Sequence, residues 1–207
     1  GGEYLVASPA TSGLPGGRVR IVRVVAADTN VTLSYDPPQP GAPETLVNVG
    51  DVGWVTSYDY QTGLFSASAD QTFRISANKR ILVAEYMVNQ EYDGQEGDPA
   101  MTIAVPADQY RDNYKFHAPL SYTSNYVNVV AQTDATIELD GETVGGFVAI
   151  GATGMSVARV PLAAGPANNC NHLIVGSAPF GITVYGYSDW TSYWYPGGLD
   201  LDEIIIQ

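Results

Sequence analysis

The stretch F-G-I-T-V-Y-G-Y-S-D-W-T-S-Y-W-Y-P-G-G-L-D-L, Phe180–Leu201, decides how the rest of the chain is interpreted. Its first part alternates, with Ile182 and Val184 on one face and Thr183 and Tyr185 on the other. Such alternation predicts a half-buried β-strand. The second part holds two Trp and two Tyr residues but no Lys or Arg, and it predicts an aromatic loop.

The predicted strand has a counterpart near the middle of the chain, which indicates an internal duplication. At an offset of 101 residues, S-A-N-K-R-I-L-V-A-E-Y from Ser76 aligns with S-A-P-F-G-I-T-V-Y-G-Y from Ser177. The same offset aligns L-V-N-V-G-D-V-G-W from Leu46 with F-V-A-I-G-A-T-G-M from Phe147. Two separate blocks therefore agree in register.

Matches outside these blocks extend the duplication in both directions. Upstream, Val24 aligns with Val129 at an offset of 105, and Tyr4 aligns with Tyr114 at an offset of 110. The offset shrinks along the chain because the loops of the second unit are shorter. Downstream, the offset of 101 predicts a last strand over Ile204–Ile206.

The duplication predicts two tandem units, residues 1–107 and 108–207, joined by a short linker at about 107–113. In the first unit, strand-forming stretches follow one another at short intervals between Gly- and Pro-rich turns. They are Tyr4–Ala7, Val19–Ala26, Val31–Tyr35, Thr45–Val49, Gly53–Ser57, Leu64–Ser68, Phe73–Ser76, Arg80–Val88 and Met101–Val105. Asp140-Gly141 predicts a two-residue hairpin in the second unit, and only Pro106–Tyr114 predicts a short helical turn. We therefore predict an all-β fold of two β-sandwich or jelly-roll-like units packed together, with a single larger sandwich as the alternative.

The composition restricts the partners and the compartment. Asp and Glu number 22 against 9 Lys and Arg, so the net charge of −13 makes nucleic acid and anionic membranes unfavourable partners. No apolar run approaches the roughly 20 residues that span a bilayer, so no membrane insertion is expected. The chain begins with Gly1-Gly2, which predicts a mature chain or an excised fragment. The lone Cys170 allows no internal disulfide and predicts a buried thiol or a pair with another part of a larger protein.

Several motifs in the matched blocks resemble the IgGFc-binding protein N-terminal domain family, including its bacterial members. They are I-L-V-A-E-Y-M-V (81–88), G-D-P-A-M-T-I-A-V-P (97–106), N-Y-V-N-V-V-A (125–131), V-A-R-V-P-L (157–162) and Y-P-G-G-L-D-L (195–201). The resemblance implies an extracellular binding domain, and it implies no catalytic residues. It does not by itself imply immunoglobulin binding, because the name comes from one branch of the family. The absence of paired Cys favours a bacterial member.

Four aromatic residues are the candidate ligand-binding set: Trp190, Tyr193, Trp194 and Tyr195. Aromatic side chains on a Gly-rich loop can stack on a sugar ring or anchor a protein partner. The structural alternative is that they cover the end of a sandwich or fill the junction between the two units.

An acidic segment, D-G-Q-E-G-D, provides the candidate metal ligands Asp93, Glu96 and Asp98. Hard oxygen ligands clustered on a loop suit Ca²⁺, although this spacing is not that of an EF-hand. The alternative is a solvated acidic loop, and no other cofactor is expected.

The sequence gives little support to an enzyme. Cys170-Asn171-His172 places a thiol near an imidazole, but a Cys–His nucleophile also needs convergence in space and a third group that orients the base. His117 is the other imidazole. Pairs of carboxylates suited to glycoside hydrolysis can be chosen from any set of 22 acids, so their presence carries little weight.

The leading hypothesis is a non-enzymatic secreted or cell-surface module that serves binding or adhesion within a larger extracellular protein. Its expected partner is a protein or glycan. The alternative is a structural repeat that assembles into a fibre or surface layer through strand edges such as Ile204–Ile206. A carbohydrate-processing enzyme is a third hypothesis and requires a deep cleft with converging carboxylates.

Overall fold

The computed structural model describes residues 1–59, 61–66, 68–94, 96–165 and 167–201. It is built almost entirely of antiparallel strands, so the predicted all-β class is confirmed. Each strand predicted for the first unit overlaps an observed strand, whereas the strand predicted at Ile204–Ile206 lies outside the described residues. Within the described ranges, no helix has the length and apolar character needed to cross a membrane.

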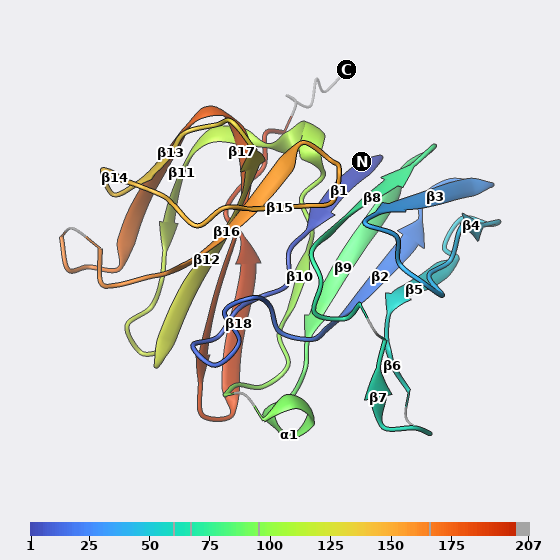
Figure 1. The fold of residues 1–207 in the computed structure, drawn as a ribbon, viewed down its shortest axis with the longest axis horizontal. Helices are drawn as coiled ribbons and strands as arrows, with labels where there is room; N and C mark the ends of the chain where they lie inside the picture. The colour runs from blue at the N-terminus through green and yellow to red at the C-terminus, as the bar shows by residue number, and fades with distance from the viewer. Residues whose placement is uncertain (60, 67, 95, 166, 202–207) are drawn as a thin grey trace, which may run out of the picture.

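The first half of the chain forms two four-stranded sheets and a small hairpin (Figure 1). The sheet order β1-β8-β3-β4 consists of β1 (Glu3–Val6), β8 (Phe73–Ala77), β3 (Val31–Asp36) and β4 (Thr45–Leu46). The order β10-β9-β2-β5 consists of β10 (Met101–Ile103), β9 (Ile81–Met87), β2 (Arg20–Ala26) and β5 (Val52–Thr56). The hairpin joins β6 (Tyr58–Asp59) to β7 (Leu64–Phe65), and a single helical turn, α1 (Gln90–Asp93), follows β9.

The second half is organised around β17 (Asn171–Ser188), a continuous strand of 18 residues. Its first part pairs with β11 (Arg111–His117) and β13 (Ile137–Leu139), and β13 pairs with β14 (Glu142–Thr143). Its last part pairs with β12 (Ser124–Gln132) and β18 (Thr191–Pro196). The sheet continues from β12 to β16 (Met155–Pro161) and β15 (Val148–Ala149). The short 3-10 helix η1 (Ala107–Gln109) precedes β11, where the sequence predicts a helical turn.

The two halves share one order of strand pairing. The order β4-β3-β8-β1 recurs as β14-β13-β17-β11, and β5-β2-β9-β10 recurs as β16-β12-β17-β18. Every ladder in the described residues joins strands of the same half. An internal duplication predicts this arrangement. The single strand β17 occupies the position of β8 in one order and the position of β9 in the other.

Strand register corrects one detail of the proposed repeat. Val24 lies opposite Val83, whereas Val127 lies opposite Val184. With β9 and β17 aligned at an offset of 101, the residue equivalent to Val24 is therefore Val127 and not Val129. The sequence alignment is therefore shifted by two residues. Because side chains alternate with a period of two, Val127 and Val129 lie on the same face of the strand, and both fit the apolar pattern.

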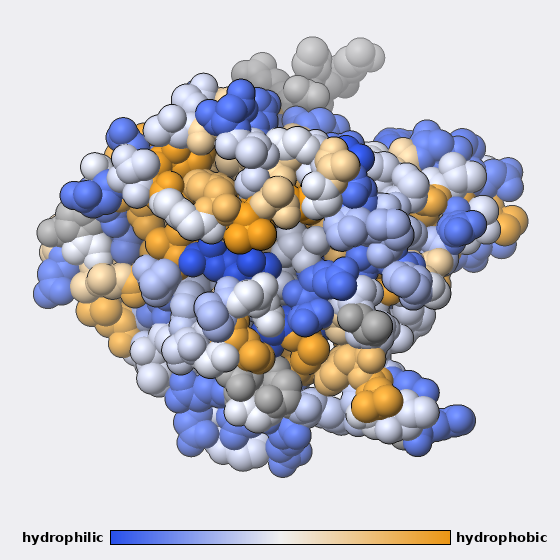
Figure 2. Space-filling model, viewed as in Figure 1, coloured by the Kyte–Doolittle hydropathy of each residue, from blue (hydrophilic) through white to orange (hydrophobic). Residues whose placement is uncertain are grey.

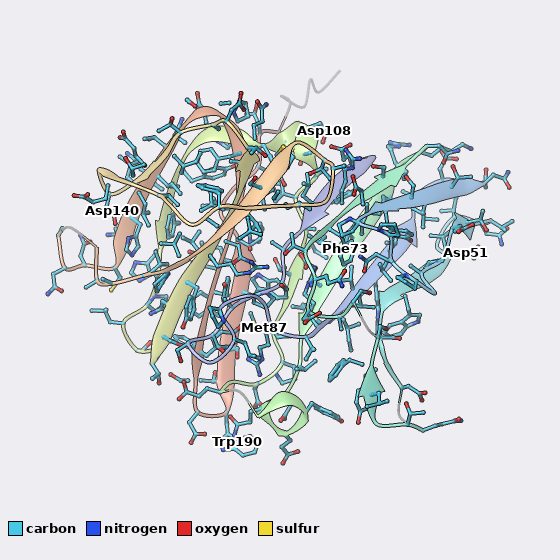
Figure 3. All side chains as sticks on the ribbon, in the orientation of Figure 1. Asp51, Phe73, Met87, Asp108, Asp140 and Trp190 are labelled. Carbon is cyan, nitrogen blue, oxygen red and sulfur yellow. The ribbon has the colours of Figure 1, made fainter. Side chains whose placement is uncertain are left out.

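Each half has its own hydrophobic core between its strands. In the first half, Val22 and Val24 of β2 meet Phe73 and Ile75 of β8, and Phe73 lies in the middle of this half in Figure 3. In the second half, the core residues are Phe116, Val127, Val129, Ile137, Ile174, Phe180, Ile182 and Val184, with neighbours. Alternation along the strands therefore fills both cores.

The junction between the halves is apolar in one part and hydrogen-bonded in another. Leu5 and Ala7 pack with Val130 and Val157 of the second half. The side-chain amide of Asn128 donates to the carbonyl oxygens of Ala7 and Ser8, both at 3.1 Å. The two halves are thus joined by packing and by paired polar groups.

A second cluster closes the junction with aromatic rings. Met87 packs with Tyr126, Tyr185, Tyr187 and Trp194, and it lies between the two halves in Figure 3. The second half takes part with one face of its β12–β17 sheet, since Tyr185 lies directly opposite Tyr126 in the ladder. This face of the sheet points away from the core of the second half, and it is buried in the junction between the two halves.

Candidate functional site

The outer face of the β10-β9-β2-β5 sheet is uncovered and largely apolar. Residues directly opposite in the ladders share this face, as Arg23 does with Ala84 and Trp54. We call this set the open face: Ile21, Arg23, Val25, Val52, Trp54, Leu82, Ala84, Tyr86, Met101 and Ile103. Its large exposed members include Trp54 at 45% and Met101 at 51%. Apolar side chains gathered on an exposed surface mark interaction sites.

Arg23 lies in the middle of the open face between two aromatic rings. Its guanidinium carbon is 3.8 Å from the centre of the Trp54 ring and 4.9 Å from that of Tyr86. Both distances are within the range of cation–π attraction. Among the described residues, Arg23 makes no ion pair or hydrogen bond, and its Nε atom is buried without a partner. Within the described part of the chain, the two rings are what holds this cation.

An aromatic pocket of about 240 Å³ opens beside Arg23. Its far wall consists of Tyr58, Phe65 and Tyr92, whose rings lie 4.9 to 6.5 Å apart. Tyr58 and Phe65 come from the β6–β7 hairpin, and Tyr92 comes from α1. Figure 1 shows this hairpin projecting beside α1, and Figure 2 shows hydrophobic surface on the projection.

Local turns hold the walls of the pocket in place. In the hairpin, the Asp59 carboxylate accepts hydrogen bonds from the Gln61 N–H and the Thr62 hydroxyl at 2.8 and 2.9 Å. These bonds hold the pKa of Asp59 below its ordinary value. In α1, the side chain of Asn89 caps the N–H of Glu91, and Gly94 ends the turn with a positive φ of 70°.

The predicted aromatic set does not form one platform. The predicted loop is largely the strand β18, so Trp194 faces the junction while its neighbours face the other way. Trp194 is 6% exposed, which corrects its assignment to an exposed binding surface. Tyr193 and Tyr195 are half-buried, and their hydroxyls donate to Asn125 at 2.7 Å and to the His117 carbonyl.

Trp190 is the member of that set that stays on the surface. It occupies the turn between β17 and β18 with a positive φ of 52° and is 52% exposed. Its backbone N–H lies 3.5 Å from the side-chain oxygen of Gln90 in α1. Figure 3 labels Trp190 at the lower end of the molecule. Ligand binding at Trp190 and at the two half-buried tyrosines stays a prediction.

The predicted calcium ligands are not gathered in the described structure. Among the described residues, no group of three His, Cys, Asp or Glu side chains could hold a metal ion. Asp98 accepts a hydrogen bond from the Asn89 amide at 3.1 Å, and the carbonyl of Glu96 accepts one from Arg18. Asp93 ends α1, and its side chain lies outside the described part of the structure. Calcium binding therefore stays a prediction.

An open depression of about 640 Å³ lies at the β11 side of the second half. There His172 is buried, stacks on Phe116 and lies 2.7 Å from the carboxylate of Asp140. The predicted Asp140-Gly141 turn is confirmed, with positive φ at both residues. Among the described residues, the imidazole makes no hydrogen bond with the buried thiol of Cys170.

The family comparison covers most of both halves. The model for the family described as IgGFc binding protein matches residues 1–186. The chain belongs to this IgGFc-binding family. No curated protein matches it. A solved structure named anti-sigma factor domain-containing protein shares 11% sequence identity, with 94% of this chain and 81% of that chain covered, at a TM-score of 0.25.

The IgGFc-binding domain thus places an exposed group of aromatic side chains at positions where the sequence predicted no site. The open face and its pocket depend on residues far apart in sequence, chiefly Arg23, Trp54, Tyr86 and Tyr92. One signal was present: in R-I-V-R-V-V-A, the face opposite the core also carries Ile21 and Val25 beside a cation. An outward face of that composition indicates contact with something other than water.

Proposed function

We propose that this domain is a non-enzymatic extracellular module, part of a larger secreted or cell-surface protein, that recognises a protein partner through its open face. Membership in a family of binding domains supports this proposal. The observation that carries it is Arg23, held between Trp54 and Tyr86 without a polar partner among the described residues. Arg, Trp, Tyr and Met are enriched at the centres of protein interfaces, and the open face contains all four.

The pocket gives the open face a place for an anchor. A concave site lined by Tyr58, Phe65 and Tyr92 can take one apolar side chain of a partner, which is how well-packed hot spots bury an anchor residue. Desolvating such rings gives more affinity than the flat part of the surface. The site therefore combines a pocket, a cation and an apolar rim.

Self-assembly is a second candidate function. Exposed Val52, Leu82 and Ile103 on the open face favour it, because large exposed apolar patches also promote association between copies. Light scattering across a concentration series separates the two candidates: recognition predicts a monomer, and assembly predicts a mass that rises with concentration.

Binding to purified proteins tests the proposal. Immunoglobulin G Fc and a panel of secreted and surface proteins are presented to the immobilised domain by biolayer interferometry. For any protein that binds, we expect Trp54→Ala and Tyr92→Ala each to weaken affinity at least about tenfold, as hot-spot residues do.

Trp190→Ala is the matched control, since Trp190 and Trp54 have similar exposure, 52% and 45%. It should leave affinity within about twofold, the range expected of a residue outside the binding centre. A partner that is lost with Trp190→Ala and retained by both open-face variants would move the binding site to the β17–β18 turn and overturn the proposal.

A further inference from the structure

Three basic side chains of this acidic chain lie within ion-pair distance of a carboxylate, and in the described part of the chain Arg23 does not. Arg20 lies 2.7 Å from Glu85, Arg74 lies 3.5 Å from Asp36, and Lys79 lies 3.6 Å from Asp28. Arg23 has no carboxylate within ion-pair distance among the described residues. Its charge is thus available to a partner.

The rings around Arg23 determine how that charge can be used. Trp54 lies directly opposite it on β5, and Tyr86 flanks it from β9, so the guanidinium is held in a fixed position. A guanidinium stacked on rings keeps its terminal N–H groups for hydrogen bonding in its own plane. Those groups match the two oxygens of a carboxylate.

Arg23 also lines the aromatic pocket, so charge and pocket are adjacent. From this juxtaposition, and resting on the proposed function, we infer that the partner is a protein segment with two features. It places an Asp or Glu carboxylate on Arg23, and it inserts an apolar side chain into the pocket, against the wall formed by Tyr58, Phe65 and Tyr92. Acidic residues next to a bulky apolar residue are the chemistry that this site recognises.

A second copy of this chain is a poor match for the site. At the junction, the first half presents Leu5 and Ala7 to the equivalent face of the second half. In the repeat alignment anchored on Tyr4 and Tyr114, Lys115 and His117 stand at those positions, and both are exposed. A copy docking in the same way would place the charged Lys115 and the polar His117 on the apolar open face, in positions where Leu5 and Ala7 pack in the junction. Burying a charge against apolar surface without a partner is costly.

A peptide display experiment on the intact domain tests the inference. A library of random 12-residue peptides is selected on the wild-type protein, and individual peptides are then measured by fluorescence anisotropy. We expect enriched peptides to carry Asp or Glu close to an aromatic or branched aliphatic residue. Replacing that acid by its amide should weaken binding to wild type at least tenfold, and to Arg23→Gln less than twofold.

Three variants make this cycle specific to Arg23. Arg23→Lys keeps the charge but loses the planar fork, and we expect an intermediate affinity. Arg111→Gln, an exposed arginine of the second half, is the matched control and should bind the peptides like wild type. Thermal unfolding of each variant confirms that the fold is retained.

The outcomes separate the inference from the proposed function. In one outcome, Tyr92→Ala abolishes peptide binding, but replacing the peptide's acid by its amide weakens binding equally to wild type and to Arg23→Gln. That result would overturn the contact between the carboxylate and Arg23 and would still support binding through the open face. If neither Tyr92→Ala nor Trp54→Ala affects any selected peptide, both fall. The inference also fails if no acidic peptide is enriched, if only sialylated or uronic oligosaccharides bind in an Arg23-dependent way, or if Trp54→Ala dissolves a dimer of this chain.

Discussion

The same face of the same sheet is exposed in one half of the molecule and buried in the other. In the first half, Tyr86 of β9 belongs to the open face. Its counterpart at an offset of 101 is Tyr187 of β17, which is fully buried in the junction beside Met87. Two halves with the same order of strand pairing thus use corresponding surfaces for two purposes, and what differs is whether another part of the chain lies on the surface.

The connections between strands differ as well. In the first half, the segment between β5 and β8 forms the β6–β7 hairpin, and α1 follows β9. In the second half, no described strand lies between β16 and β17, and a turn at Trp190 joins β17 to β18. The aromatic pocket is therefore built from segments that the second half lacks, so recognition is expected from the first half alone.

The largest expected effect is on stability, at the equivalent tyrosines. Tyr187→Ala should lower the free energy of unfolding by about 3–5 kcal/mol, as truncation of a buried aromatic side chain does. Tyr86→Ala should lower it by about 1 kcal/mol, because its ring is partly exposed and loses mainly its contact with Arg23. Urea unfolding followed by tryptophan fluorescence measures both.

Equal losses at Tyr86 and Tyr187 would break this comparison, because they would mean that the open face is as buried in solution as the junction. The m-value serves as the control, since an unchanged m-value shows that both variants unfold from the same compact state. A changed m-value for Tyr187→Ala alone would instead show that the halves separate before they unfold.

A smaller loss of stability is expected at Tyr4 and Tyr114, whose hydroxyls make similar hydrogen bonds in the two halves. The Tyr4 hydroxyl donates to the Ile81 carbonyl at 2.7 Å, and the Tyr114 hydroxyl donates to the carbonyl of Phe180. Tyr4→Phe and Tyr114→Phe each remove the hydroxyl that donates to a carbonyl, and each should cost about 0.5–1.5 kcal/mol. Thermal or urea unfolding tests the comparison: similar losses support equivalent roles, and a loss at one position only contradicts them.

The sequence predicted the strands and the Asp140-Gly141 turn because both follow from local patterns. Alternation in β2 places Val22 and Val24 in the core, and the Asp140-Gly141 pair supplies the positive φ that its hairpin turn needs. The sequence aligns Tyr4 and Pro9 with Tyr114 and Pro119, and in the structure each tyrosine donates to a main-chain carbonyl of its own half.

The sites were harder to predict because exposure is a property of tertiary packing. A run rich in Trp and Tyr predicts a loop, yet β18 continues the sheet, and alternation sends Trp194 into the junction. The open face draws on Arg23, Trp54 and Tyr86 from three strands, which no local window contains together. Packing between the halves determines which of the two corresponding faces is covered. The repeated sequence pattern is the same for both faces and therefore does not predict it.

The smallest expected effect is a loss of stability at alkaline pH, to which Tyr4 and Tyr114 should contribute differently. Burial first, and then Asp108, raise the pKa of Tyr4 from 10.0 to about 12. Burial also raises the pKa of Tyr114, but hydrogen bonding and the positive charge of Arg111 oppose the rise. A tyrosine with a raised pKa in the folded state contributes stability below about pH 10, where both states are protonated. That contribution is lost as the pH rises from about 10 to 12, because the unfolded chain releases the proton first.

The free energy of unfolding, measured in urea at steps between pH 9 and 11.5, should therefore fall as the pH rises. Tyr4→Phe should make this fall shallower than Tyr114→Phe does. The reason is that the N–H and the positive charge of Arg111 oppose the rise in the pKa of Tyr114 more strongly than Asp200 and Asp112 add to it, whereas nothing among the described residues opposes the rise at Tyr4. Tyr92→Phe is the control, since Tyr92 is exposed. If Tyr114→Phe flattens the curve more, the charges around the two equivalent tyrosines do not act as their positions predict, and the halves differ in burial instead.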